Sequence, residues 1–243
     1  HLRLPNRCLA RKKVPGTSLS RCAGAEPNPA GYLDRRSTHM DLEEMRANVA
    51  ADLDDAGGDI WSSVELDRAI RRALREYSAV CPHRLDALIE LEADGREVSL
   101  SAIDGLAGVE RVCYPYDAAA PEWPPRWREF EHRAGVLTLM VSPMPTAGEW
   151  VRVYCWALHA LDGLDDATAT TLPPADEELI ALGAAGYAAL EKSRAAVGQV
   201  NVSGYTPLHW AEWAERRLTA FAERLAEVGR QQAGRESGPV AMR

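Results

Sequence analysis

Several motifs that would identify a chemistry are missing from this chain of 243 residues. It contains only three lysines, Lys12, Lys13 and Lys192, and none of them follows a glycine, so the P-loop of nucleotide-binding proteins is absent. No two glycines are separated by a single residue, which excludes the G-x-G core of the dinucleotide-binding fingerprint. The G-x-S-x-G turn of serine hydrolases is absent as well. The sequence therefore offers no nucleotide-binding or hydrolase motif.

Long apolar runs and paired cysteines are also lacking. The most apolar stretch, residues 181–190, is short and rich in Ala and Gly, whereas a membrane helix needs roughly 18 or more apolar residues. The cysteines are odd in number and have no C-x-x-C spacing: Cys8, Cys22, Cys81, Cys113 and Cys155. We therefore expect a soluble protein with free thiols, suited to a reducing cytoplasm, and no membrane partner.

Basic residues outnumber acidic residues only in the first 39 residues. Residues 1–39 hold eight Arg or Lys against two acids and carry +6, so residues 40–243 carry −14 of the total of −8. Binding to a nucleic-acid backbone depends on clustered Lys and Arg, which release counterions. The acidic body therefore argues against nucleic acid as a partner for most of the surface.

The basic segment 1–39 is set apart from the rest. Its four prolines interrupt any helix, and it lacks the apolar core of a secretory signal. We interpret it as a basic tail or a non-native leader, because recognisable periodicity begins only at Met40. The alternative is a functional basic arm that binds an acidic partner or DNA.

Residues 40–83 predict two helices. Apolar residues at helical spacing predict the first over residues 42–53. The second starts at Ser62, which forms a capping box with Glu65, and Trp61 is placed to pack against the first turns as a hydrophobic staple. Its outer face carries Arg71, Arg72 and Arg75. These arginines either pair with nearby acids or form a contact surface.

Residues 84–160 are predicted to be a β-rich insertion. Five segments have the pattern of strands, and Asp94-Gly95 between the first two predicts a hairpin. Residues 120–134, rich in Pro and Trp, are expected to be a loop. The last segment, residues 149–157, places Trp150, Tyr154 and Trp156 on one face. We expect that face to be an interface, unless a second sheet packs over it and buries it.

The remaining residues predict a linker (161–175), C-terminal helices (176–232) and a polar tail (233–243). The first of these helices contains Gly183 and Gly186, and each internal glycine costs about 1 kcal/mol relative to Ala, so a close partner is expected there. Thr206 as a cap and Pro207 at the first position begin the last helix, whose apolar stripe runs from Leu208 to Val228. Residues 40–232 are thus predicted to form one compact α+β unit, a helical bundle from the N- and C-terminal helices with an inserted antiparallel β region.

No residue set identifies a catalytic or metal site. Cys81 with His83 and Cys155 with His159 are conceivable zinc ligands, but neither pair has zinc-finger spacing. Carboxylates are so abundant that none is distinguished as an acid/base pair. We predict no cofactor, no bound metal and no enzyme activity.

The order of three motifs resembles one known family. W-S-x-x-E-L-x-x-A-I-x-x-A-L-x-E-Y spans residues 61–77, G-E-W-V-R-V-Y-C-W-A-L-H-A-L-D spans residues 148–162, and E-E-L-I-x-L-G-A-A-G-Y-A-A-L spans residues 177–190. Together, over about residues 40–230, they are similar to the head-to-tail adaptor proteins of tailed bacteriophages and related prophages. Residues 1–39 lie outside this pattern.

The resemblance implies a non-enzymatic structural protein of the virion neck, assembled in the host cytoplasm. Such adaptors form a homo-oligomeric ring, commonly of twelve subunits, between the portal protein and the tail or stopper proteins, and packaged DNA passes through without sequence-specific binding. In the family the C-terminal helix and tail often bind the portal, which here implies Arg230, Gln231, Arg235 and Arg243. The expected ring interface comprises Arg71, Arg72, Arg75, Gly183 and Gly186.

Two other functions remain open. A small DNA-binding or regulatory α+β protein requires the basic segment 1–39 and the three arginines of residues 71–75 to share one surface. An enzyme with a scattered acidic site, with His132 as one candidate, requires carboxylates with shifted pKa values to converge in a pocket.

Overall fold

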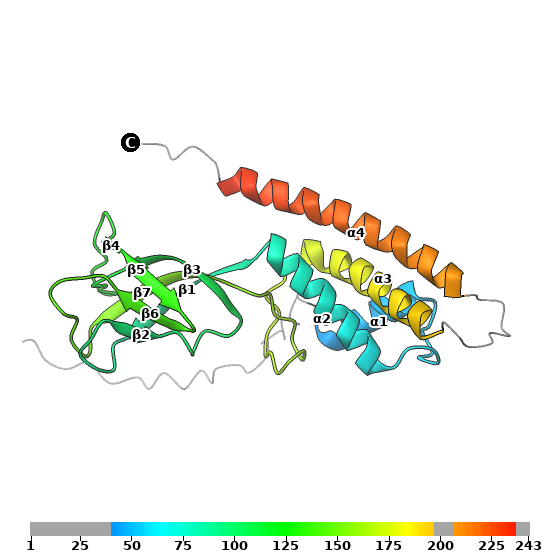
Figure 1. The fold of residues 1–243 in the computed structure, drawn as a ribbon, viewed down its shortest axis with the longest axis horizontal. Coiled ribbons are helices and arrows are strands. Elements are labelled where there is room, and N and C mark those ends of the chain that lie inside the picture. Colours follow the sequence, from blue (N-terminus) through cyan, green and yellow to red (C-terminus); the bar gives the residue numbers. More distant parts are fainter. Residues whose placement is uncertain (1–39, 197–206, 237–243) are drawn as a thin grey trace, which may run out of the picture. The chain divides into compact units, whose positions relative to one another are not determined.

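The computed structural model describes residues 40–196 and 207–236, all within one compact unit (Figure 1). Over these ranges the protein is α+β, with four α-helices and two antiparallel sheets, which confirms the predicted α+β class. None of the helices in these ranges is both long and apolar enough to cross a membrane. The predicted tail 1–39, the cap at Thr206 and residues 237–243 lie outside the described residues.

The first two helices form where the sequence predicts them. In α1 (Leu42–Asp52) the Asp41 side chain caps the helix by accepting the N–H of Glu44 at 2.8 Å. In α2 (Ser63–Val80) the predicted capping box is present, with Ser62 and Glu65 each bonding the other's backbone N–H. These caps satisfy N–H groups that have no partner inside the helix.

Seven strands build the two sheets of the β region. Their bounds are β1 (His83–Glu90), β2 (Glu97–Ser99), β3 (Leu106–Cys113), β4 (Trp127–Arg128), β5 (Phe130–Arg133), β6 (Val136–Leu139) and β7 (Trp150–Ala157). The first sheet has the order β1-β7-β3-β4, and the second has the order β2-β6-β5. The longest strand pairing, β1 with β7, therefore joins segments that are distant in the sequence.

The predicted hairpin at Asp94-Gly95 is wrong. β1 pairs with β7 and β2 with β6, so the strands on either side of this turn belong to different sheets. The Asp94 carboxylate accepts the N–H of Ala147 at 2.8 Å, and the Gly95 N–H donates to the carbonyl of Pro145 at 3.0 Å. This turn is therefore held by hydrogen bonds to the loop of residues 145–147, and not by hydrogen bonds between the strands on either side of it.

The predicted loop over residues 120–134 is also partly wrong, because it contains β4 and β5. The two-residue hairpin of the β region lies next to it, where Arg133 pairs with Val136 across Ala134 and Gly135. Both turn residues have positive φ, 50° and 78°, as a type I′ turn requires. Alanine rarely adopts this conformation, so an alanine at this position does not predict a turn from the sequence.

The two sheets share one apolar core. On β7, Val151, Val153 and Cys155 face inward and are at most 2% exposed, and they pack in one cluster with Leu137 and Leu139 of β6. The alternate residues of β7 face the other way and are half-buried or exposed. The second sheet therefore covers one face of the first sheet and leaves the aromatic face of β7 accessible.

The chain returns from β7 to the helices through residues 158–173, and this segment packs against the helices. Leu161, Leu164 and Leu172 of this segment are buried in the helical core. A 3-10 helix (η1, Pro174–Asp176) then leads into α3 (Glu177–Ala195). α4 spans Pro207–Glu236.

α3 is the most buried helix of the described chain. It packs against α1, α2 and α4, and most of its residues from Glu177 to Ala189 are buried. On α4, Phe221 and Leu225 are buried as predicted, but Leu208 is 63% exposed, so its assignment to the apolar stripe is wrong. Trp210, two residues later in the same turn, packs against the core, and two residues on a helix point to nearly opposite sides, so Leu208 faces outward.

Candidate functional site

The outer face of the first sheet carries a set of aromatic and arginine side chains that are exposed or half-buried. We call it the aromatic–arginine face. It consists of Arg84, Arg111, Trp127, Trp150, Arg152, Tyr154 and Trp156. Strand alternation directs all of them away from the apolar core. Trp127 and Trp150 are 42% and 39% exposed, which is high for residues of this size.

Strand register brings the arginines onto the rings. Arg84 lies opposite Trp156 in the β1–β7 pairing, and its guanidinium carbon is 4.1 Å from the centre of the indole ring. Arg111 of β3 lies 5.1 Å from the ring centre of Trp127, which in turn contacts Tyr154 edge to face at 5.4 Å. Such contacts hold rings and cations in one orientation. The face is therefore ordered before any partner binds.

Arg152 is the polar centre of this face. Its guanidinium donates to the Asp86 carboxylate and to the hydroxyl of Tyr116 at 2.8 Å, and it lies 5.1 Å from the ring centres of Tyr116 and Tyr154. Hydrogen bonding to Asp86 raises the pKa of Arg152 further above its ordinary value. A fixed cation between aromatic rings favours recognition of another protein surface, where Tyr, Trp and Arg supply most of the binding energy.

The loop between β3 and β4 adds one further exposed aromatic residue. Trp123 is 89% exposed, the highest exposure of any large apolar side chain in the described ranges. Because so little of its surface is buried, this tryptophan contributes little to the stability of its own chain. It is therefore a candidate anchor for a partner.

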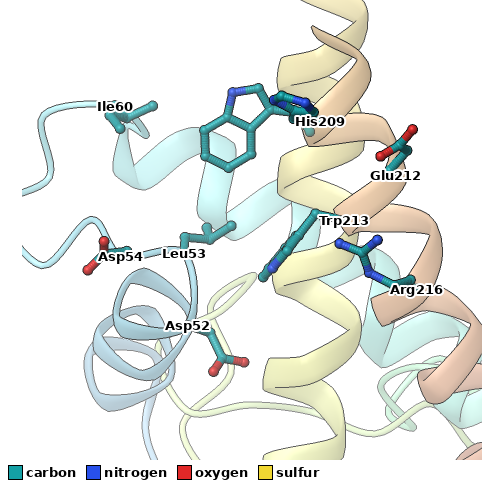
Figure 2. A pocket seen from close by; sticks show the side chains of 9 residues that line it. Asp52, Leu53, Asp54, Ile60, His209, Glu212, Trp213 and Arg216 are labelled. Carbon is teal, nitrogen blue, oxygen red and sulfur yellow. The ribbon is translucent and has the colours of Figure 1, made fainter. Parts of the chain in front are cut away.

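A pocket of about 530 Å³ lies between the end of α1 and the first turns of α4. Figure 2 shows Trp213 and Arg216 on α4 directed toward Asp52 and Leu53, and Glu212 also lines the pocket. Beside the pocket, Arg217 pairs with Asp52 at 3.2 Å and lies 4.9 Å from the ring centre of Trp213. An indole wall with carboxylates nearby suits a flat or cationic group.

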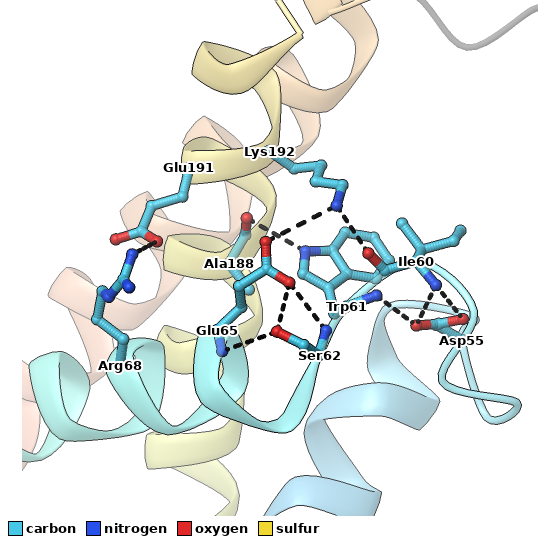
Figure 3. A network of polar contacts seen from close by, with 9 residues as sticks. All are labelled: Asp55, Ile60, Trp61, Ser62, Glu65, Arg68, Ala188, Glu191 and Lys192. Atoms are coloured by element: carbon cyan, nitrogen blue, oxygen red, sulfur yellow. Dashed lines mark hydrogen bonds and ion pairs between the residues drawn. The ribbon is translucent and has the colours of Figure 1, made fainter.

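The network before α2 is structural (Figure 3). The carboxylate of Asp55, which is 5% exposed, accepts the backbone N–H groups of Asp59, Ile60 and Trp61 at 2.9–3.1 Å. Burial alone would raise the pKa of Asp55, but these three donors and the charge of Lys192 hold it below its ordinary value. A carboxylate held in this way stabilises the turn and is a poor proton acceptor.

Trp61 fastens the same turn to two helices. It is 3% exposed, its indole N–H points to the carbonyl of Ala188 on α3 at 3.4 Å, and its ring meets Trp210 of α4 edge to face at 5.1 Å. The Lys192 ammonium donates to the carbonyl of Ile60 at 2.7 Å. Trp61 is therefore part of the packing between helices, and its predicted contact with the first turns of α2 stays a prediction.

Two of the three predicted arginines on α2 are engaged within the chain. Arg71 forms a two-point ion pair with Asp165, with distances of 2.6–3.0 Å, and hydrogen bonding to Arg71 lowers the pKa of Asp165. Arg72 lies 4.0 Å from the ring centre of Tyr187 and pairs with Glu76. Arg75 is exposed, and its charge also lowers the pKa of Asp165. Their role in a ring interface stays a prediction.

Gly183 and Gly186 have the close helix partner that the sequence predicts, but this partner is α4 of the same chain. A Cβ added at Gly183 would lie 2.9 Å from the ring of Phe221, and one added at Gly186 would lie 2.9 Å from Leu218. Both glycines are buried. While α4 stays in place, they offer no surface to a neighbouring subunit.

The predicted portal-binding residues lie at the end of α4. Arg230 and Gln231 are exposed and bond only within their own helix among the contacts described, Arg230 to the carbonyl of Ala226 and Gln231 to Glu227. Arg235 belongs to the last turn of α4, and Arg243 lies outside the described residues. The two described side chains are available for a partner.

The conceivable zinc ligands lie near the junction between α2 and β1. The rings of His83 and His159 are 5.4 Å apart, and burial together with the nearby His83 lowers the pKa of His159. His159 Nδ1 lies 3.1 Å from the carbonyl of Thr171 and 3.2 Å from its hydroxyl. Across residues 40–196 and 207–236, no three or more His, Cys, Asp or Glu side chains are arranged to hold a metal ion. His132 is exposed on β5.

Sequence reasoning identified Trp150, Tyr154 and Trp156 but missed the arginines that order them. Arg84 and Arg111 come from strands that end 37 or more residues before β7 begins, so only the strand register places them. The pocket at Trp213 was missed for the same reason, since α1 and α4 are at opposite ends of the described chain.

Comparison with known proteins adds no family to this picture. No family model matches the chain, and no curated protein matches it.

Proposed function

We propose that this protein is a head-to-tail adaptor of a tailed bacteriophage or prophage. In this proposal, copies of the chain form a ring, with twelve subunits as the expected number, that joins the portal of the DNA-filled head to tail or stopper proteins. The protein acts as a structural part of the virion neck, and packaged DNA passes through the ring.

The observation that supports this function best is the aromatic–arginine face. Rings of Trp127, Tyr154 and Trp156 are held in fixed positions by arginines, while the second sheet buries only the opposite face. A preordered surface of this composition loses little side-chain entropy on association. It suits permanent contacts with other protein subunits, and this is the main requirement for a connector in a virion.

The fold fits the same proposal in its finer detail. We infer that α1, α2, α3 and α4 work as one helical bundle and that the β region is an insertion between α2 and α3. The bundle supplies a rigid body, and the insertion carries the contact surface. The family resemblance of residues 61–77, 148–162 and 177–190 supports this division of roles.

The end of α4 is the proposed portal contact. Arg230 and Gln231 are exposed there, and the chain continues beyond them to Arg243. A truncation after Gly229 removes these residues and the rest of the tail. It should abolish portal binding, whereas the substitution Glu223→Ala, at an exposed position of the same helix, should leave binding unchanged.

The test is the mass of the purified chain by light scattering, alone and with the matching portal. We expect a defined multimer of the chain on the portal. A chain whose mass is indifferent to the portal contradicts the proposal. Salt-dependent binding to duplex DNA by the chain alone would favour the DNA-binding alternative instead.

A further inference from the structure

Among the described strands, β1 is a regular edge strand. Among the described strands it pairs only with β7, and all eight of its residues keep one register from His83 opposite Ala157 to Glu90 opposite Trp150. It contains no proline and no bulge. β3, by contrast, has two register shifts and carries β4 on its other side. Proteins usually protect exposed edges by such irregularities, because a regular edge pairs readily with another strand.

The backbone groups on the free side of β1 can be assigned. The thiol of Cys155 contacts the carbonyl of Leu85 at 3.7 Å, and the N–H of Leu91 donates to the carbonyl of Glu149 at 2.8 Å, so odd-numbered residues direct their backbone groups toward β7. These groups alternate along a strand. Those of Arg84, Asp86, Leu88 and Glu90 therefore point away from β7.

The inward side of β1 is incompletely covered. Leu85, Ala87 and Ile89 are only partly buried, whereas Val151 and Val153 on the neighbouring strand are 0% exposed. A groove of about 670 Å³ opens beside the end of β1, and Ile89 and Val98 contribute to its lining. An additional strand at this edge would place apolar side chains over both features.

We propose that β1 pairs antiparallel with β1 of a second copy of this chain, with Ala87 on the two-fold axis. In this register Arg84 lies opposite Glu90 of the second copy, and Leu85 lies opposite Ile89 of the second copy. Opposite charges therefore meet on the outer face, and apolar residues meet on the inner face. The residues whose backbone groups point to the free edge lie opposite one another, as ladder hydrogen bonds require.

The neighbouring registers are unfavourable. A shift of the pairing by two residues in one direction places Asp86 opposite Asp86 of the second copy, and a shift in the other direction places Asp86 opposite Glu90. Like charges that face each other across a strand pair are destabilising. A shift by one residue sets inward residues against outward ones. The register centred on Ala87 is thus favoured over its neighbours, and it keeps the whole of β1 paired.

This dimer goes beyond the proposed function. A two-fold contact uses the same patch on both subunits, whereas neighbours around a ring use two different patches. The dimer is accordingly a state of the free protein that covers the β1 edge before assembly. Because the dimer forms without the portal, its test is independent of the test of the adaptor role.

The first test uses the full chain without portal and compares Leu88→Pro with Leu88→Ala by analytical ultracentrifugation. Leu88 is 43% exposed, and its N–H points to the free edge, so proline removes a donor for the second copy without removing a bond to β7. We expect the parent chain and Leu88→Ala to dimerise with rising concentration and Leu88→Pro to stay monomeric, with circular dichroism unchanged. A monomeric parent chain, or an unchanged association state in Leu88→Pro, overturns the proposal.

The second test addresses the register. Arg84→Glu and Glu90→Arg should each raise the dimer dissociation constant by about tenfold, because each puts like charges opposite each other at two symmetry-related sites. The combined variant should restore it to within about threefold of the parent. Failure of the combined variant to recover contradicts this register.

A cross-link gives an independent reading of the same register. Ala87→Cys should form an intermolecular disulfide under mild oxidant, because only this position faces itself across the axis. Ile89→Cys, on the same face of β1, is the matched control and should cross-link no more than the parent chain. Equal cross-linking of both variants overturns the two-fold register.

Discussion

α3 and β7 are the central elements of the helical region and the β region, and they are built in opposite ways. α3 is buried on nearly all sides, and its glycines and alanines let α1, α2 and α4 approach. β7 buries Val151, Val153 and Cys155 on one face and keeps Trp150, Tyr154 and Trp156 on the other. A centre that is buried on nearly all sides contributes packing alone, whereas a centre with two different faces contributes packing on one face and leaves the other face accessible.

We therefore expect changes in α3 to affect mainly stability, and changes on the outer face of β7 to affect mainly the binding of a partner. At its tightest contacts α3 presents only Gly183 and Gly186 to Phe221 and Leu218 of α4, so any addition to α3 there disturbs the fold. On the outer face of β7 the large side chains are held by half-exposed contacts, which contribute little to folding. Changes in the two regions should therefore have opposite consequences.

The largest effect is expected where α3 meets α4. Gly183→Leu adds a side chain where even a Cβ would lie 2.9 Å from the ring of Phe221, so we expect it to lower the free energy of unfolding by about 3 kcal/mol. Gly234→Leu is the matched control, because a Cβ at Gly234 would meet nothing within 4 Å. Because leucine favours a helix more than glycine does, Gly234→Leu should leave the free energy of unfolding unchanged or raise it by up to about 1 kcal/mol. Urea unfolding measures both, and equal effects would refute the assigned packing of α3.

A medium effect is expected at Asp55, and it depends on pH. The folded state holds the pKa of Asp55 below its ordinary value of 3.8, so the stabilisation is complete above that pH and is lost as the pH falls through the folded pKa. Asp55→Asn should cost about 1–3 kcal/mol at pH 7, because backbone N–H groups lose a charged acceptor. The difference between variant and parent should shrink below about pH 3.8. Thermal unfolding over this pH range checks it, and a constant difference would contradict the assigned role.

The smallest effect on stability is expected on the aromatic–arginine face. Trp156→Ala removes the contact with Arg84 and should lower the free energy of unfolding by about 1 kcal/mol or less. If the face is an interface, the same change should weaken assembly on the portal by about tenfold or more. Leu208→Ala, at an exposed position of α4, is the control for both measurements. A Trp156→Ala variant with a large loss of stability but normal assembly on the portal would contradict the expectation that this face serves contact rather than folding.

Local signals in the sequence predicted the helices well. Ser62 and Glu65 lie within one turn of each other, and the reciprocal bonds that they form need no information from the rest of the chain. Pro207 similarly marks the start of α4, because its ring suits a first helical position. Elements that are decided within four residues are the ones that a sequence alone predicts.

Long-range pairing was not predictable in the same way. Asp94-Gly95 has the composition of a hairpin turn, yet β1 finds its partner in β7, some 60 residues later. The true two-residue hairpin contains Ala134, whose positive φ follows from the pairing of β5 with β6 rather than from its own preference. The arginines of the candidate site depend on this pairing too, which is why only its aromatic half was foreseen.

The edge-to-face contact of Trp61 with Trp210 has an optical consequence. Two indoles whose centres are 5.1 Å apart and whose planes are inclined by 83° couple their electronic transitions, and such coupling gives a paired positive and negative band in circular dichroism. Trp61 belongs to the turn before α2 and Trp210 to the first turns of α4. The paired band therefore reports, without any added label, whether α4 remains docked while the protein assembles.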